Sequence, residues 1–243
     1  MAHTHRFCVI AGARSGSEYF TTRLNEHPEI ACHRELFNRR RFVTALDEER
    51  VAKLPSLASR DADPIAAIDA VAALSADAFP GKRYFGFKVF LSHNQEIRKH
   101  VREDLRYKLI VLERKNKLAQ YASLLTSRRT GVWSVWAADA QRPGRETVKV
   151  DIPGLEHYVR LENQRYSEFG RRIAQRPDVL RMTSEELDSR FQEILEFLEV
   201  DASTQLPVVR LRQNPDPLAE RVENWTKVLN WLNANGHEDW ATG

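Results

Sequence analysis

The 243-residue chain has no long hydrophobic run, few cysteines and little excess of charge of either sign. No stretch reaches the roughly 20 apolar residues that cross a bilayer, and no apolar signal segment opens the chain, so we expect no membrane span. Cys8 and Cys32 both lie in apolar surroundings, which favours packed thiols in a reducing cytoplasm over a disulfide or a metal site. The formal net charge of +3, from 37 basic and 34 acidic residues, argues against nucleic-acid binding through bulk electrostatics.

Apolar runs of strand length alternate with helical patterns along the chain. The predicted strands are 7–11, 30–32, 84–90, 107–112 and 179–182. The predicted helices follow the first strand and cover 95–102, 117–125, 155–173 and 218–232, with two modest helices within 46–74 and one that opens at Ser184. This alternation predicts one domain over 1–243, a central parallel sheet flanked by helices in three α/β/α layers, with a variable acceptor-side or lid region at about 46–80.

A loop of small residues joins the first strand to the first helix. It consists of Gly12, Ala13, Arg14, Ser15, Gly16 and Ser17. Such a loop aims backbone N–H groups and the positive end of a helix dipole at one point, which predicts a site for phosphate or sulfate. Arg14 adds a planar fork of donors suited to these anions, and Ser15 or Ser17 could cap the helix. The plain alternative is an ordinary strand-to-helix turn.

Two phosphate chemistries compete for this loop. Cys8 and Arg14 have the spacing of cysteine-dependent phosphatases, but Val9 and Ile10 continue the apolar run beyond Cys8 and would bury its thiol in the sheet. That reading is therefore the less favoured one. The loop also lacks the Lys-Ser/Thr end with which ATP- and GTP-using loops bind phosphate and Mg²⁺, so we expect no metal. A sulfuryl donor fits better.

Further basic residues follow other predicted strands. Arg114 comes just past the strand 107–112, and ligands of parallel sheets bind at the carboxyl ends of the strands, so we expect Arg14 and Arg114 at one edge. Lys88 interrupts an apolar strand. A cluster follows the second strand and consists of Arg34, Arg39, Arg40 and Arg41. A solvated basic face and a role in attracting an anionic ligand are equally favoured for this cluster.

These motifs resemble the sulfotransferases that use 3′-phosphoadenosine 5′-phosphosulfate (PAPS). Residues 12–17 resemble their 5′-phosphosulfate loop, and 109–114, with Ser123 nine residues after Arg114, resemble their 3′-phosphate motif. The likeness is greatest to bacterial carbohydrate sulfotransferases of the trehalose 2-sulfotransferase type, which have Arg-Ser-Gly-Ser in the loop. The resemblance covers most of the chain, because residues 86–88, 184–198 and 212–225 also resemble segments of these enzymes. Residues 46–80 match no known pattern, so the resemblance does not imply that trehalose is the acceptor.

The resemblance implies a set of site residues. Glu35, in the context His-Arg-Glu-Leu-Phe, matches the catalytic base of the trehalose-type enzymes; the alternative is a surface carboxylate paired with nearby arginines. Arg14 and the loop would bind the 5′-phosphate and neutralise charge on the leaving oxygen. Arg114 and Ser123 would hold the 3′-phosphate; their alternatives are a salt bridge and a helix-face hydroxyl.

Weaker predictions concern the acceptor. Lys88 could approach the sulfuryl group or the acceptor, and a lysine reaching from a strand end to solvent is equally plausible. Trp133 and Trp136 could stack on a sugar face, though core anchoring is the favoured role. Glu18 stands where the family usually has threonine, so its charge would weaken donor binding if it turned toward the loop.

The sequence therefore predicts an enzyme that moves a sulfuryl group from PAPS to a hydroxyl of a carbohydrate or small metabolite, releasing 3′-phosphoadenosine 5′-phosphate (PAP). The predicted setting is cytoplasmic, without nucleic acid or a membrane span, and a homodimer is a possible assembly. A non-catalytic nucleotide-binding or interaction protein that keeps the fold is the main alternative, supported by Glu18 and by the unmatched region 46–80.

Overall fold

Five parallel strands form one sheet in the computed structural model, which describes residues 3–133, 146–206 and 217–242. The strand order is β2-β3-β1-β4-β5. The strands are β1 (His5–Ala11), β2 (Ile30–Glu35), β3 (Tyr84–Phe90), β4 (Tyr107–Glu113) and β5 (Val179–Thr183). All five predicted strands are confirmed, and β5 lies at an edge as a short strand should. The first strand lies in the centre, so the loop that follows it opens at the middle of the sheet.

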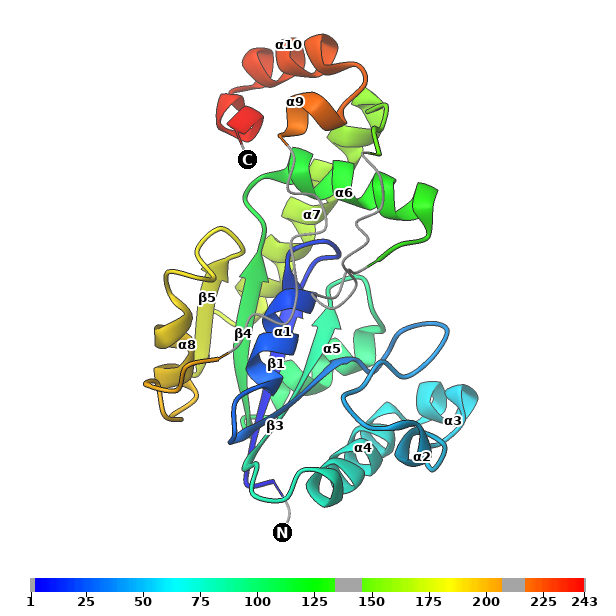
Figure 1. Cartoon of the computed structure of the whole chain (residues 1–243), viewed down its shortest axis with the longest axis vertical. Coiled ribbons are helices and arrows are strands. Elements are labelled where there is room, and N and C mark those ends of the chain that lie inside the picture. The colour runs from blue at the N-terminus through cyan, green and yellow to red at the C-terminus, as the bar shows by residue number, and fades with distance from the viewer. Residues whose placement is uncertain (1–2, 134–145, 207–216, 243) are drawn as a thin grey trace.

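Helices cover both faces of this sheet (Figure 1). One face packs against α4 (Pro64–Ala78), α5 (Gln95–Glu103) and α7 (Ile152–Arg172). The other face packs against α1 (Ser17–Asn25) and α8 (Phe191–Phe197). The remaining helices are α2 (Glu48–Val51), α3 (Leu57–Ala62), α6 (Lys117–Thr130), α9 (Leu218–Arg221), α10 (Trp225–Asn235) and the 3-10 helix η1 (Glu238–Thr242). The predicted three-layer α/β/α architecture is confirmed.

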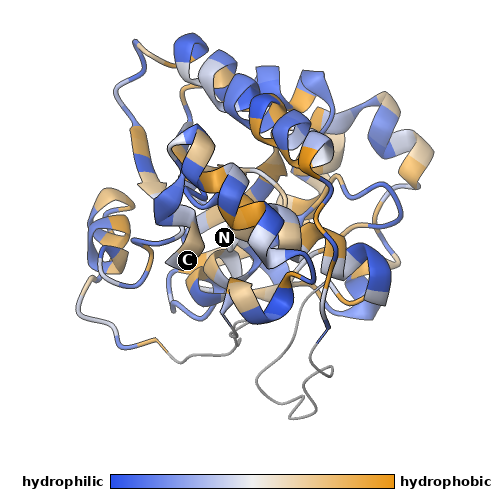
Figure 2. Ribbon diagram, turned by 90° about the horizontal axis from the view of Figure 1, so that it is seen from above, coloured by the Kyte–Doolittle hydropathy of each residue, from blue (hydrophilic) through white to orange (hydrophobic). Residues whose placement is uncertain are grey.

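Successive side chains of β1 point to opposite faces of the sheet and so belong to two different core layers. Cys8 and Ile10 point into the layer under α5 and α7, whereas Phe7 and Val9 point into the layer under α1 and α8. All four side chains are fully buried. A third apolar cluster joins α6, α9, α10 and η1 beyond the carboxyl ends of the strands. Seen from above, hydrophilic residues line the outer helices (Figure 2). No helix of the described ranges is long and apolar enough to cross a bilayer.

The observed helices differ from the predicted ones in three regions of the chain. The helix expected to open at Ser184 begins at Phe191, because the Glu186 carboxylate accepts from both the N–H and the hydroxyl of Thr183 and holds a turn there. The helix expected over 218–232 is divided into α9 and α10. Backbone hydrogen bonds between Val148 and residues 221–223 draw the chain out of helical geometry at that point. The region 46–74 contains three helices, not two.

A close approach between β1 and β3 requires glycine at position 86. A Cβ atom there would lie 2.0 Å from the ring of Phe7, which is fully buried. The Gly86→Ala substitution should therefore lower the free energy of unfolding by about 1–3 kcal/mol or more, measured by denaturant titration. In a Phe7→Leu background the same substitution should cost less, because the smaller side chain leaves room; equal costs in both backgrounds would contradict this account.

Candidate functional site

The loop between β1 and α1 is built on two residues with left-handed backbone. Arg14 has φ 63° and Gly16 has φ 76°, and Gly16 occupies the N-cap position of α1. No side chain caps this helix, so the expectation of a Ser15 or Ser17 cap is wrong. The hydroxyl of Ser15 instead donates to the carbonyl of Gly12 at 2.8 Å and closes the loop on itself. The first turn of α1 thus keeps the open, positive end that favours anions.

Side chains of α6 and α7 form hydrogen bonds with the backbone of the β1–α1 loop. The Tyr166 hydroxyl accepts from the N–H of Gly12 at 2.6 Å and donates to the carbonyl of Leu112, the residue before the end of β4, at 2.7 Å. The side-chain amide of Gln120 donates to the carbonyl of Ala13 at 2.7 Å. A Cβ atom at position 12 would lie 2.4 Å from a carboxylate oxygen of Glu162, so any larger residue there requires the Glu162 side chain to shift. The position of the loop is therefore set by distant helices.

The structure brings Arg14, Arg114 and Ser123 together. The Arg14 guanidinium donates from Nε to the Ser123 hydroxyl at 3.0 Å, and Nη1 of Arg114 donates to the carbonyl of Arg14 at 3.4 Å. Burial lowers the pKa of Arg14 to about 10, with a further lowering by the charge of Arg114. Two guanidinium groups thus share a confined, partly dehydrated place, and an anion bound there would relieve their repulsion. Arg14 and Arg114, predicted to lie at one edge of the sheet, are in contact there.

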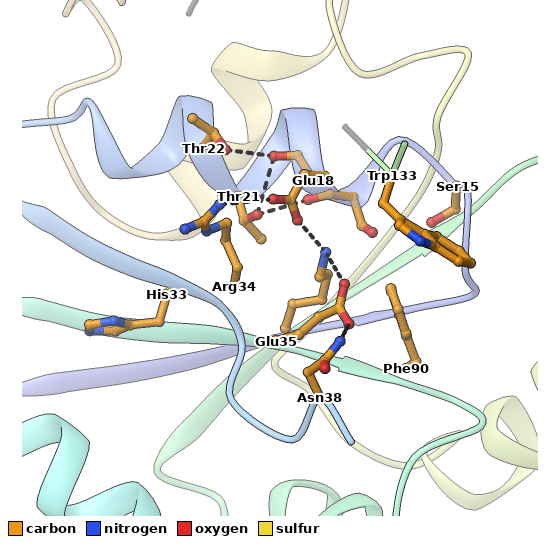
Figure 3. A network of polar contacts seen from close by, with 12 residues as sticks. Ser15, Glu18, Thr21, Thr22, His33, Arg34, Glu35, Asn38, Phe90 and Trp133 are labelled. Atoms are coloured by element: carbon orange, nitrogen blue, oxygen red, sulfur yellow. Dashed lines mark hydrogen bonds and ion pairs between the residues drawn. The ribbon is translucent and has the colours of Figure 1, made fainter. Parts of the chain in front are cut away.

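A second polar group lies on the β2 and β3 side of the loop (Figure 3). The ammonium of Lys88, whose side chain is only 1% exposed, lies 2.8 Å from Oε2 of Glu18 and 3.2 Å from Oε1 of Glu35. Arg34 contacts the other oxygen of Glu18 at 3.2 Å, and the amide of Asn38 donates to the other oxygen of Glu35 at 3.1 Å. Two carboxylates and two cations therefore balance one another. We call these five residues the Lys88 network.

The strand register explains why the network forms. Glu35 lies opposite Lys88, with a register shift in β2 between Cys32 and Glu35. Glu18 projects from the first turn of α1 toward β2 and β3, and its charge is neutralised there. Glu35, 19% exposed at the side chain, also keeps contact with solvent. The carboxylate at position 18 thus contacts Lys88 and Arg34, and its charge also acts on Arg14 of the loop, whose pKa it raises.

The structure contradicts the expected role of Trp133 and agrees with the expectation for both cysteines. Trp133 is 51% exposed, and its carbonyl accepts from Nη1 of Arg14 at 2.5 Å, so the expectation of core anchoring is wrong. Trp136 lies outside the described residues. Both cysteines are free and buried, as expected. Burial raises the pKa of the Cys8 thiol well above its usual value, and a thiol inside the sheet cannot serve as a phosphatase nucleophile.

Several residues of the site could not be predicted from the sequence. Tyr166, Gln120 and Glu162 come from helices far along the chain and carry no motif. His93 follows β3, and its Nδ1 accepts from the N–H of Phe90 at 3.1 Å. Over the described ranges, no three His, Cys, Asp or Glu side chains are grouped so as to hold a metal ion.

Comparison with known proteins bears on the fold. No protein-family model matches the chain, and no curated protein matches it in sequence. A crystal structure of a sulfotransferase from Alicyclobacillus acidocaldarius aligns with 97% of this chain and 94% of its own, at 16% identity and a TM-score of 0.50. The chain has the sulfotransferase fold. At such low identity the likeness extends to the fold and to nothing further.

Two other solved structures align with lower scores. Mouse sulfotransferase SULT7A1, complexed with PAP, covers 98% of this chain and 84% of its own at 10% identity and a TM-score of 0.47. The sulfotransferase domain of the Synechococcus PCC 7002 olefin synthase covers 93% of this chain and 89% of its own at 16% identity and a TM-score of 0.42.

The Tyr166 hydroxyl provides a test of how the sulfotransferase-fold loop is held. Tyr166→Phe leaves the Gly12 N–H and the Leu112 carbonyl without this partner and should lower the free energy of unfolding by about 1–3 kcal/mol. Tyr158→Phe is the matched control, because the buried Tyr158 hydroxyl has no hydrogen-bond partner in the described ranges and its loss should cost less than about 1 kcal/mol. Equal costs of the two substitutions, measured by chemical denaturation, would contradict the bridging role.

Proposed function

We propose that the protein transfers a sulfuryl group from PAPS to a hydroxyl group of an acceptor. The observation that carries this proposal is the convergence of Arg14 with Arg114 and Ser123 at the carboxyl edge of the sheet, within a sulfotransferase fold. A nucleotide with phosphates at both ends of its ribose needs two anion sites at a fixed spacing. One loop with a single arginine would serve a simple phosphate equally well; the second basic point favours the doubly phosphorylated donor.

The donor side follows from the loop. Residues 12–17 and Arg14 would bind the 5′-phosphosulfate, and Arg114 and Ser123 would bind the 3′-phosphate. In the reaction an acceptor oxygen forms a bond to sulfur while the bond from sulfur to the phosphate oxygen breaks, and PAP leaves with that electron pair. Arg14 would offset the negative charge that grows on the leaving oxygen. The chemistry needs no covalent enzyme intermediate.

The acceptor side follows from the Lys88 network. A sugar or alcohol hydroxyl is a weak nucleophile, so a carboxylate that takes its proton as the O–S bond forms lowers the barrier. We assign that role to Glu35, which Lys88 and Asn38 hold from two directions. Trp133 offers an exposed aromatic ring for the acceptor. The region 46–80 would form the acceptor side, with a carbohydrate or small metabolite as acceptor.

A non-catalytic nucleotide-binding protein is the second candidate. The observation in its favour is that both oxygens of Glu35 already have partners, Lys88 and Asn38, so that an acceptor hydroxyl must share one of them. This candidate binds PAP and transfers no sulfuryl group to any member of a broad hydroxyl panel.

Donor recognition can be measured by thermal unfolding with PAP and with ADP, which lacks the 3′-phosphate. At about a hundredfold its dissociation constant, PAP should raise the midpoint by roughly 5–10 °C, and ADP should raise it much less. Arg114→Ala should reduce the PAP shift toward that of ADP and leave the ADP shift unchanged. Equal shifts with both nucleotides, or none with either, would overturn the assignment of the donor.

The role of Glu35 can be separated from its place in the Lys88 network. Glu35→Gln should lower turnover by about 10²–10⁴-fold, because the amide cannot take the proton, while PAP affinity stays close to that of the wild type. Glu18→Gln is the matched control: it removes the other carboxylate of Lys88 and should retain far more turnover. PAP formation from PAPS, with an acceptor from the hydroxyl panel, is the readout. Equal losses in both variants would assign the effect to the network instead of to proton transfer.

A further inference from the structure

Three consecutive exposed arginines follow the strand that carries the proposed base. Arg39, Arg40 and Arg41 are all exposed, and within residues 3–133, 146–206 and 217–242 no carboxylate lies within ion-pair distance of their guanidinium groups. We call them the arginine run. The run begins four residues after Glu35, so its first Cα atom lies at most about 14 Å from that of Glu35.

A buried arginine fixes the loop that bears the run. Arg60, on α3, is 1% exposed and donates from Nη1 to the carbonyl of Leu36 at 3.0 Å and to that of Asn38 at 2.8 Å. Its guanidinium lies 5.8 Å from the ring centre of Phe37 and 5.2 Å from that of Phe42. A buried cation satisfied by backbone carbonyls holds the loop in one conformation. The arginine run is therefore presented by an ordered loop.

The same loop is tied directly to Glu35. The backbone carbonyl of Glu35 accepts from the N–H groups of Asn38 and Val43, at 3.2 and 3.1 Å, so the loop begins and ends on this residue. Asn38 donates from its side-chain amide to the Glu35 carboxylate at 3.1 Å and accepts from the N–H of Arg40 at 3.0 Å. One side chain thus connects the proposed base to the backbone of the arginine run.

Among the described residues, no carboxylate of the site pairs with the arginine run. The Lys88 network is balanced within itself, and Asp61 is paired with Arg60 at 2.8 Å. Burial lowers the pKa of His93 to about 4; Glu35 raises this pKa, whereas Lys88, Arg60 and Arg39 lower it. Arg39 and Glu35 therefore act on the same imidazole. Like charges held together on an ordered loop repel one another, and a bound anion would offset that repulsion.

We propose that the acceptor carries an anionic group, a carboxylate, phosphate or sulfate ester, which the arginine run binds while the acceptor hydroxyl lies at Glu35. The inference rests on the proposed sulfuryl transfer and narrows its acceptor to hydroxylated acids, sugar phosphates and acidic saccharides. Guanidinium groups bind such oxyanions with paired hydrogen bonds, and exposed arginines also raise the local concentration of an anionic acceptor.

The test uses the full-length protein saturated with PAP, so that the donor site is filled, and inorganic phosphate as the probe. Phosphate affinity is measured by calorimetric titration for the wild type and for Arg39→Ala/Arg40→Ala/Arg41→Ala. The matched control is Arg160→Ala/Arg171→Ala/Arg172→Ala, which removes the same charge from exposed positions of α7. We expect phosphate affinity to fall by about tenfold or more in the first variant and to stay within about twofold in the control.

The result that overturns the inference is phosphate affinity that is unchanged by loss of the arginine run, or equal losses in the two triple variants. Sulfuryl-transfer assays test the inference independently, by comparing turnover of glucose with that of glucose 6-phosphate and glucuronate. Preference for the anionic members that disappears in the arginine-run variant supports the proposal, and preference for glucose contradicts it. Failure of the proposed function is seen separately, as absence of PAP binding by the wild type.

Discussion

A buried ammonium must have its charge compensated nearby, and this constraint organises the edge of the sheet around Lys88. Its side chain is almost wholly removed from solvent, and two carboxylates from different elements, Glu18 on α1 and Glu35 on β2, contact it. An unpaired lysine at this depth would be strongly destabilising. The contacts of the Lys88 ammonium therefore fix the positions of α1, β2 and β3 relative to one another.

The site divides its electrostatics into two unlike parts. On one side, the guanidinium groups of Arg14 and Arg114 lie close together, and although the carboxylates of Glu18 and Glu35 act on Arg14 and raise its pKa, burial and the charge of Arg114 lower it to about 10. On the other side, the charges of the Lys88 network add up to zero. A proton transfer to Glu35 would therefore take place without a large excess of positive or negative charge nearby. A donor with several negative charges and an acceptor that must lose a proton call for such a division. The fold supplies it by placing the two groups at the ends of neighbouring parallel strands.

The sequence predicted those features that depend on local pattern. Short β-branched runs and their Gly/Ser loop predicted the parallel sheet, and strand ends predicted that Arg14 and Arg114 would meet. The partners of Lys88 could not be read from the chain, because they depend on a register shift in β2 that leaves no periodic signal. Tyr166 and Gln120 escaped for a related reason: each reaches the loop from a helix more than 100 residues away in sequence. Trp133 was misjudged because aromatic character alone does not distinguish a core ring from an exposed one.

The close contact between Gly12 and Glu162 has a consequence for how relatives of this chain can diverge. The carboxylate occupies the space where any side chain at position 12 would begin, and the neighbouring Gln120 and Tyr166 fill the rest. A larger residue at position 12 requires the Glu162 side chain either to turn away or to be replaced by a shorter one. Substitutions at the two positions should therefore be coupled among homologues, although one belongs to the loop after β1 and the other to the middle of α7.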